Sequence, residues 1–158
     1  MGRLLPYYVL LIAVLIWCGA IVLPPLAASS QPLISTLGYR FFGLICHQED
    51  AHSLHLVGYP LAVCARCTGI YFGFLIGIIL SPLLSPGVAS FPRLGWAIAI
   101  VPMLLDVGAD LIGVHASTPA TRIASGTFFG AAAALLLAPH LIGLYRRNQP
   151  SARNELKT

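Results

Sequence analysis

The residues best suited to chemistry are cysteines and histidines gathered in one short stretch, residues 46–71. Cys64 and Cys67 form a C-x-x-C pair, whose spacing lets two thiolates bind one tetrahedral metal ion or form a disulfide with each other. Cys46 and His47 lie about 17 residues upstream, a loop length typical of split zinc sites. Three sulfurs and one imidazole form a closed structural zinc site. We therefore predict a site for zinc, or alternatively iron, at these four residues.

Other donors lie near this stretch or elsewhere in the chain. His52 and His55 are alternative nitrogen ligands for the same ion. Cys18 sits in the middle of a long apolar run, where a cysteine usually behaves as a small packing residue. His140 is expected to be a hydrogen-bonded histidine near the opposite membrane face. His52 and His55 are therefore the secondary candidates for the metal site, and Cys18 and His140 are not expected to bind the ion.

Two acidic residues form a second candidate site. Asp106 and Asp110 are four residues apart in an apolar run, so they share one face of a helix. A charge at the bilayer centre costs at least about 2.5–3.5 kcal/mol, so such residues usually face a cavity or a partner. We predict a catalytic pocket formed by Asp106, Asp110 and Arg122; a purely structural pairing of the aspartates with Arg122 is the alternative. Arg66, between the two cysteines, could bind a phosphate or carboxylate headgroup with its bidentate donors.

The composition indicates a membrane protein, most of whose surface is in contact with lipid. Of its 158 residues, 58% are hydrophobic and 9% are charged, and the mean hydropathy is +0.85. Soluble domains carry about 25% charged residues to cover their surface. These values exclude a water-soluble globular protein, a nucleic-acid-binding module and a disordered chain. Membrane lipids are the expected partners, and no nucleic acid is expected to bind.

Four apolar runs approach the length of about 20 residues that a membrane-spanning helix needs. The predicted spans are residues 4–23, 68–84, 94–114 and 122–145. They predict an all-α membrane protein, a four-transmembrane-helix bundle in a single domain over residues 1–145. The first run has a long apolar core followed by two prolines, so we expect a retained helix rather than a cleaved signal.

The first two spans are joined by an outer loop, residues 24–67, and the last is followed by a basic tail, residues 146–158. Within the loop, apolar residues at helical spacing over residues 32–45 predict a short amphipathic or re-entrant helix at the outer membrane interface. The Cys/His stretch lies in the second half of this loop.

Positive charges predict the orientation in the cell membrane. Cytoplasmic termini would place six Lys and Arg residues inside and three outside, so both termini and the tail are predicted to be cytoplasmic. The inside set is Arg3, Arg93, Arg146, Arg147, Arg153 and Lys157, and the outside set is Arg40, Arg66 and Arg122. With four spans, all the candidate site residues fall on one side of the membrane. They are Cys46, His47, Cys64, Arg66, Cys67, Asp106, Asp110, His115 and Arg122.

Glycines recur every four residues on two of the predicted spans. Gly69, Gly73 and Gly77 share a face of the second span, and Gly126 and Gly130 share a face of the fourth. Small residues at this spacing let helix backbones approach closely in lipid. The pattern predicts tight helix packing and could also support a homo-oligomer through the glycine-lined faces.

Several strings resemble a known family. These are CHQ at residues 46–48, CARCTGIYFG at residues 64–73, the Asp-x-x-x-Asp pair, and the S-T-x-x-x-R-x-x-S-G pattern at residues 117–126. Together they resemble a family of predicted prokaryotic multi-pass membrane proteins classed as a domain of unknown function, over roughly residues 40–130. The resemblance implies a shared site but no activity. In the family pattern the second acidic position is more often glutamine, which makes Asp106 a stronger candidate than Asp110.

Three functions are compatible with these features. The first is an integral membrane protein with a metal site at the outer interface beside the Asp/Arg pocket, which could act on a lipid or another anionic membrane substrate. The second is a quinone-coupled thiol–disulfide oxidoreductase in which Cys64 and Cys67 shuttle electrons and Cys46 is the exchanging thiol. A full relay would need another loop cysteine, and Cys18 lies inside a span. The third is a structural subunit or small carrier.

Overall fold

The computed structural model describes residues 5–88, 92–113 and 117–147. Its elements in chain order are α1 (Leu5–Ala27), α2 (Pro32–Gly43), a 3-10 turn (Asp50–His52), β1 (Ser53–Leu56), β2 (Tyr59–Cys64), α3 (Ala65–Val88), α4 (Pro92–Leu111) and α5 (Pro119–Arg147). Four helices, α1, α3, α4 and α5, are long and apolar enough to cross a membrane. The predicted helical membrane protein with four spans and a short extra helix is confirmed.

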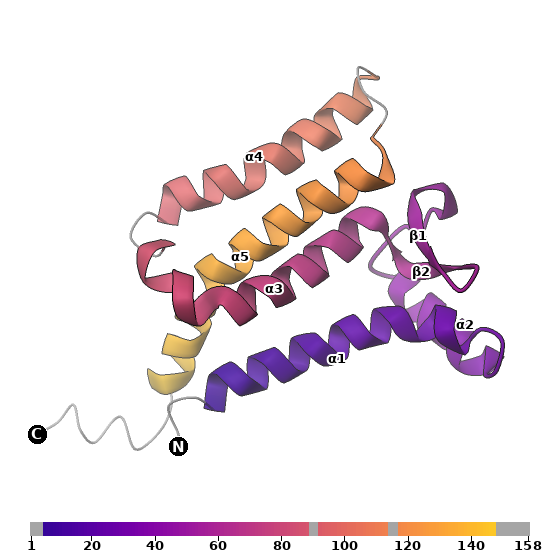
Figure 1. Ribbon diagram of the computed structural model, residues 1–158, viewed down its shortest axis with the longest axis horizontal. Helices are drawn as coiled ribbons and strands as arrows, with labels where there is room; N and C mark the ends of the chain where they lie inside the picture. The colour runs from indigo at the N-terminus through magenta and orange to yellow at the C-terminus, as the bar shows by residue number, and fades with distance from the viewer. Residues whose placement is uncertain (1–4, 89–91, 114–116, 148–158) are drawn as a thin grey trace, which may run out of the picture.

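The four long helices lie side by side in the order α1, α3, α5, α4 (Figure 1). The hairpin and α2 are at one end of this bundle, together with the start of α3, the end of α4 and the start of α5. The start of α1 and the end of α5 are at the opposite end. This up-and-down path carries the cysteine loop, both aspartates and Arg122 to the same end, which we call the hairpin end.

Helix α1 runs further than the apolar pattern predicts. It continues through Pro24 and Pro25 to Ala27, whereas the sequence suggested an end at the prolines. Both proline rings are fully buried, and a side chain at Gly38 of α2 would collide with the Pro24 ring. The close fit between α1 and α2 therefore compensates for the backbone hydrogen bonds that proline cannot make.

Glycines hold α3 and α5 in backbone contact. A side chain at Gly69, Gly73 or Gly77 would strike the α5 backbone, and one at Gly126 or Gly130 would strike the α3 backbone. The two glycine-lined faces thus pack against each other within one chain, as expected for small residues in lipid. A contact between two copies of the chain would need another surface.

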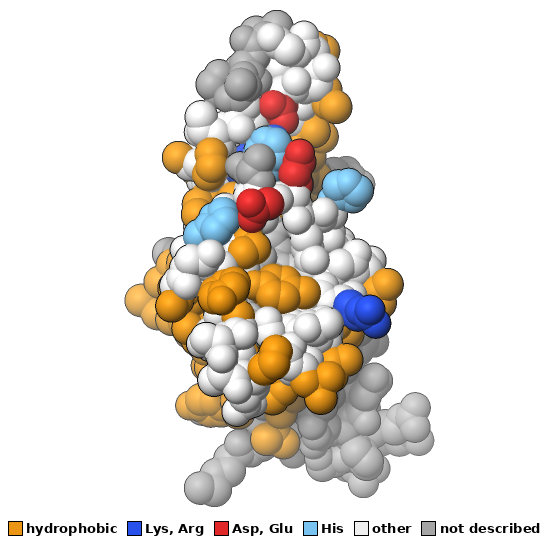
Figure 2. All heavy atoms as spheres, turned by 90° about the vertical axis from the view of Figure 1, so that its right-hand side faces the viewer, with side chains coloured by type: hydrophobic (Ala, Val, Ile, Leu, Met, Phe, Trp, Pro, Cys, Tyr) orange, Lys and Arg blue, Asp and Glu red, His pale blue; other side chains and the backbone are white. Residues whose placement is uncertain are grey.

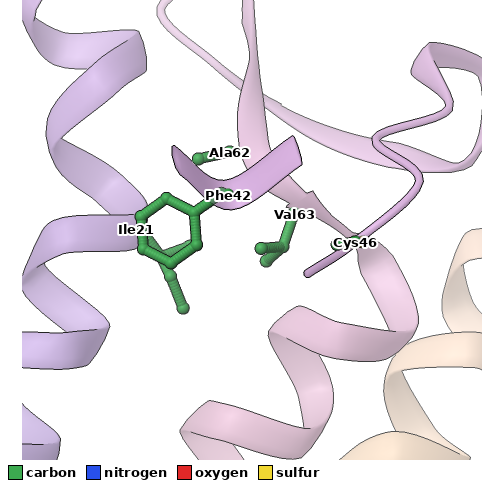
Figure 3. Close-up of a cluster of buried hydrophobic side chains, with 5 residues drawn as sticks. All are labelled: Ile21, Phe42, Cys46, Ala62 and Val63. Carbon is green, nitrogen blue, oxygen red and sulfur yellow. The ribbon is translucent and has the colours of Figure 1, made fainter. Parts of the chain in front are cut away.

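A two-stranded antiparallel hairpin occupies part of the loop between α1 and α3. Its two-residue turn has φ of 55° at Val57 and 83° at Gly58, the backbone of a type I′ turn, which matches the twist of the paired strands. The sequence analysis expected only a loop here. The hairpin is anchored by a buried cluster from α1, α2, the segment after α2, and β2 (Figure 3). Its members are Ile21, Phe42, Cys46, Ala62 and Val63.

Candidate metal centre

Three cysteine side chains meet at the hairpin end of the bundle. Cys46 follows α2, Cys64 is the last residue of β2, and Cys67 lies in the first turn of α3. Their sulfurs all lie within 4.8 Å of one another. Cys46 is buried and the other two are half-buried, and all three are free thiols. The three cysteines that the sequence pattern grouped therefore lie together in one cluster.

The position of Cys46 depends on Gln48, a residue that the sequence analysis did not single out. Gln48 adopts a left-handed backbone, with φ of 44°. Its side-chain amide donates hydrogen bonds to the carbonyl oxygens of Tyr39, at 2.8 Å, and Ala62, at 2.6 Å. The Tyr39 hydroxyl in turn donates to the carbonyl oxygen of Pro60, at 2.6 Å. Gln48 therefore ties α2 to β2 around the cluster, and its only signal in the sequence was its place in the CHQ string.

His47 lies outside the cluster, so the structure does not assemble the predicted set of three cysteines and this histidine. His47 is exposed, whereas Cys46 beside it is buried. Within residues 5–88, 92–113 and 117–147, no fourth Cys, His, Asp or Glu joins the three sulfurs. A metal ion here would be held by three thiolates from this part of the chain.

The alternative histidine ligands lie beside acidic side chains and outside the sulfur cluster. His52 Nδ1 lies 2.9 Å from Glu49, and His55 Nε2 lies 3.1 Å from Asp50. Acidic and histidine side chains gather on the face at the hairpin end (Figure 2). Both pairs are partly exposed, and neither contributes to the sulfur cluster. His115 lies outside the described residues, as does the side chain of His140.

The cluster stabilises a negative charge on Cys46. Hydrogen bonds from the Cys64 and Cys67 thiols hold the pKa of the Cys46 thiol well below its ordinary value. The backbone N–H of Cys64 also donates to Cys46 Sγ, at 3.3 Å. Metal ions bind cysteine as the thiolate, so one of the three ligands is already favoured in its binding form. Cys18, in contrast, is buried in α1, where its thiol donates to the Tyr71 carbonyl oxygen at 3.6 Å.

Asp106 is the centre of a polar network between α3, α4 and α5. Its Oδ2 accepts a hydrogen bond from Arg66 Nη2 at 2.7 Å and one from the Ser125 hydroxyl at 3.3 Å. Its Oδ1 accepts one from the Ser117 hydroxyl at 3.0 Å. The Asp106 side chain is 9% exposed and that of Arg66 is 17% exposed. This ion pair is therefore largely shielded by protein.

Asp110 forms a second ion pair one turn further along α4. Its Oδ2 accepts from Arg122 Nη2 at 2.9 Å, and its Oδ1 accepts from the Ser117 backbone N–H at 3.0 Å. The sequence pattern grouped both aspartates with Arg122. In the structure, each aspartate has its own arginine. Arg66, at the start of α3, contacts Asp106, and Arg122, at the start of α5, contacts Asp110.

These pairings decide what the charged residues can do. Each arginine that could bind an anionic headgroup already contacts an aspartate. The Arg66 Nε atom is buried and has no hydrogen-bond partner among the described residues. The serines that complete the network, Ser117 and Ser125, were missed as functional residues, although both belong to the S-T-x-x-x-R-x-x-S-G pattern. Arg66 also lies between two of the cluster cysteines in sequence, so it links the sulfur cluster to the charged network.

The chain is similar to a family of predicted membrane proteins and to uncharacterised proteins. Residues 46–136 match the family described as "Predicted membrane protein (DUF2085)". An uncharacterised protein of Methanocaldococcus jannaschii is 35% identical over 132 residues, covering 78% of this chain and 85% of the relative. An uncharacterised protein of Methanothermobacter thermautotrophicus is 28% identical over 103 residues, covering 64% of this chain and 93% of the relative. No solved structure matches the chain. The match spans the three cysteines, both aspartates and both arginines of the site, and the chain belongs to this family of predicted membrane proteins.

Proposed function

We propose that this membrane protein binds one metal ion, zinc or iron, through the thiolates of Cys46, Cys64 and Cys67. The observation that carries the proposal is the meeting of three sulfurs within 4.8 Å, from the segment after α2, the end of β2 and the start of α3. In a tetrahedral zinc site with Zn–S bonds of about 2.3 Å, neighbouring sulfurs are about 3.8 Å apart. Sulfurs that all lie within 4.8 Å of one another are compatible with that separation. Soft thiolate ligands favour zinc and iron over magnesium or calcium.

The fourth position around the ion is proposed to take a ligand from outside the cluster. Three protein ligands with one exchangeable position are the pattern of reactive metal sites, whereas four protein ligands are typical of structural ones. When bound, such an ion supplies Lewis acidity at the membrane interface. We therefore retain a lipid or another anionic membrane molecule as the proposed substrate class, with the metal, rather than the paired arginines, as its point of attachment.

The charged network is proposed to position this site. The contacts of Arg66 and Arg122 with the two aspartates tie the start of α3 and the start of α5 to the end of α4. Cys67 is adjacent to Arg66, so the ion pair fixes the helical turn that carries one ligand. A catalytic role for Asp106, Asp110 and Arg122 stays a prediction, and the contacts support positioning.

Metal analysis of the purified protein tests the proposal. We expect about one zinc or iron per chain, and we expect Cys46→Ser, Cys64→Ser and Cys67→Ser each to lose the metal, because binding needs the thiolates. The matched controls are Cys18→Ser and His47→Ala, which should retain it. Elemental analysis of detergent-purified variants gives the result. Full metal content in Cys67→Ser protein would contradict the assignment.

Cobalt substitution tests the fourth position. Protein loaded with Co²⁺ should show thiolate-to-metal absorption, and adding imidazole should change the visible bands if one position is exchangeable. His47→Ala should leave the bands unchanged. Bands that do not respond to imidazole at saturating concentration would show a closed site and contradict the exchangeable ligand.

The same three thiols support one alternative function, a quinone-coupled thiol–disulfide oxidoreductase. Cys46 is close enough to the Cys64/Cys67 pair to exchange with a disulfide formed there after a small movement. This alternative predicts metal-free protein with an oxidised Cys64–Cys67 pair. Mass spectrometry after alkylation of free thiols separates the two functions, because a metal site keeps all three cysteines reduced.

The hairpin end is proposed to face outward, with both termini in the cytoplasm. The basis is the six-to-three distribution of Lys and Arg in the sequence. The start of α1 and the end of α5 lie at the same end of the bundle, as this orientation requires (Figure 1). A green fluorescent protein fused to the C-terminus should fluoresce, and alkaline phosphatase fused there should be inactive. Active phosphatase at that position would reverse the orientation.

A further inference from the structure

Two of the three cluster cysteines are held by one continuous segment. Cys64 ends β2 and Cys67 lies in the first turn of α3. The Thr68 hydroxyl closes this junction, because it lies within hydrogen-bonding distance of the carbonyl oxygens of Cys64, at 3.1 Å, and Val63, at 3.4 Å. The positions of Cys64 and Cys67 are therefore set by the local structure where β2 joins α3.

Cys46 comes to this pair from a separate segment, 18 residues before Cys64 in the chain. Its backbone N–H donates to the Phe42 carbonyl oxygen at 2.9 Å, so the last turn of α2 holds the segment from one side. On the other side, the backbone N–H of Cys64 contacts the Cys46 sulfur at 3.3 Å. Sulfur is a weak hydrogen-bond acceptor, so the third ligand needs a further connection to β2.

Gln48 makes that connection two residues after Cys46. Its side-chain nitrogen donates to the carbonyl oxygen of Tyr39 in α2, at 2.8 Å, and to that of Ala62 in β2, at 2.6 Å. Ala62 is fully buried and lies two residues before Cys64. One amide group therefore joins the segment that carries Cys46 to the strand that carries Cys64.

We propose that Gln48 is a positioning residue for the metal site: its amide holds Cys46 in place as the third ligand and thereby determines how long the ion stays bound. This inference rests on the proposed function, since it concerns how that site retains its ion. Groups that orient metal ligands from outside the coordination sphere usually contribute about 10–100-fold to metal affinity. A side chain that is held in place before the metal binds also loses less conformational freedom on binding.

Metal release from zinc-loaded protein tests the proposal. Gln48→Met keeps the length of the side chain and leaves a non-glycine residue at φ of 44°, but it removes both hydrogen bonds. We expect this variant to transfer Zn²⁺ to a colorimetric chelator at least about tenfold faster than the unmodified protein. Gln48→Gly relieves the left-handed backbone but also lacks the amide, so it should release zinc as fast as Gln48→Met.

Tyr39→Phe is the matched control. The Tyr39 hydroxyl also ties α2 to β2, through the Pro60 carbonyl oxygen at 2.6 Å, but this bond does not involve the segment that carries Cys46. Zinc release from Tyr39→Phe should therefore stay close to that of the unmodified protein. The inference is overturned if Tyr39→Phe releases zinc as fast as Gln48→Met, or if Gln48→Met releases it at the unmodified rate.

Alkylation of metal-free protein separates this inference from the metal assignment. Cys46 is buried, so a bulky maleimide should label it slowly after chelator treatment, with the label located by mass spectrometry. Labelling should be about fivefold faster in Gln48→Met, as expected for the loss of roughly 1 kcal/mol of hydrogen bonding, and unchanged in Tyr39→Phe. If this pattern is found in a protein that binds no metal, the proposed function fails and the positioning of Cys46 by Gln48 stands. Equal labelling of Cys46 in all three proteins would overturn the inference.

Discussion

Replacing Asp106 by alanine is expected to destabilise the protein by about 3–5 kcal/mol, because the substitution leaves the Arg66 guanidinium buried without its counter-charge. Asp106 accepts hydrogen bonds from Arg66, Ser117 and Ser125, so the variant also removes the acceptor that both hydroxyls use. The measurement is the free energy of unfolding in mixed micelles, taken from a reversible denaturant titration.

Two comparisons identify the cause of this loss. Asp110→Ala should cost less, because the Asp110 side chain is 32% exposed, compared with 9% for Asp106, so the Asp110 carboxylate is more strongly screened by water or headgroups. The double variant Arg66→Met, Asp106→Leu should recover much of the stability, since replacing both members of a buried pair by apolar groups removes the unpaired charge. Equal stability of Asp106→Ala and the unmodified protein would show that Asp106 has no positioning role.

The sequence was most informative where lipid is the solvent. Runs such as residues 4–23 and 94–114 need no tertiary information to be identified as spans, since length and the scarcity of charge suffice. The amphipathic spacing in residues 32–45 likewise predicted the helix that is now α2. The spacing of Gly69, Gly73 and Gly77 predicted close packing, and the structure supplied the partner face on α5.

The site itself was only partly predictable. The residue types and their spacing in the sequence predicted that Cys46, Cys64 and Cys67 lie together. A C-x-x-C pair and one upstream cysteine on the same side of a bundle can reach one ion. His47 was assigned by adjacency to Cys46, but Cys46 is buried and His47 is exposed, and sequence spacing does not reveal which of two neighbours faces the cluster.

The pairing of charges also lay beyond the sequence. Four charged residues at one membrane depth allow two pairings, and the choice depends on how α3 and α5 are placed around α4. The glycine contacts fix α3 against α5, and their partners are far apart in the chain. The hairpin was missed because its strands are four and six residues long and its turn, Val57-Gly58, is a weak signal.

Substituting leucine for Gly73 is expected to have a large effect on the fold, with a loss of more than about 3 kcal/mol, the upper end of ordinary overpacking. A Cβ atom at this position would collide with the Thr127 backbone of α5, and backbone cannot rotate away as a side chain can. The helices must therefore separate along their whole contact. Unfolding measured in the same micelles should show the loss.

Alanine at the same position gives a stricter test. In an isolated helix, Gly→Ala is favourable by about 1 kcal/mol, so a loss of stability in Gly73→Ala must come from the contact with α5. Gly19→Ala in α1 is the matched control, because no atom lies within 4 Å of a Cβ built there, and it should be neutral or stabilising.

Because α3 also carries Cys67 and Arg66, separation of α3 from α5 should lower metal content in Gly73→Leu protein as well. A Gly73→Leu protein that is as stable as the unmodified one would mean that α3 and α5 are not in backbone contact, and the assignment of Arg66 to Asp106 and of Arg122 to Asp110 would lose its geometric basis.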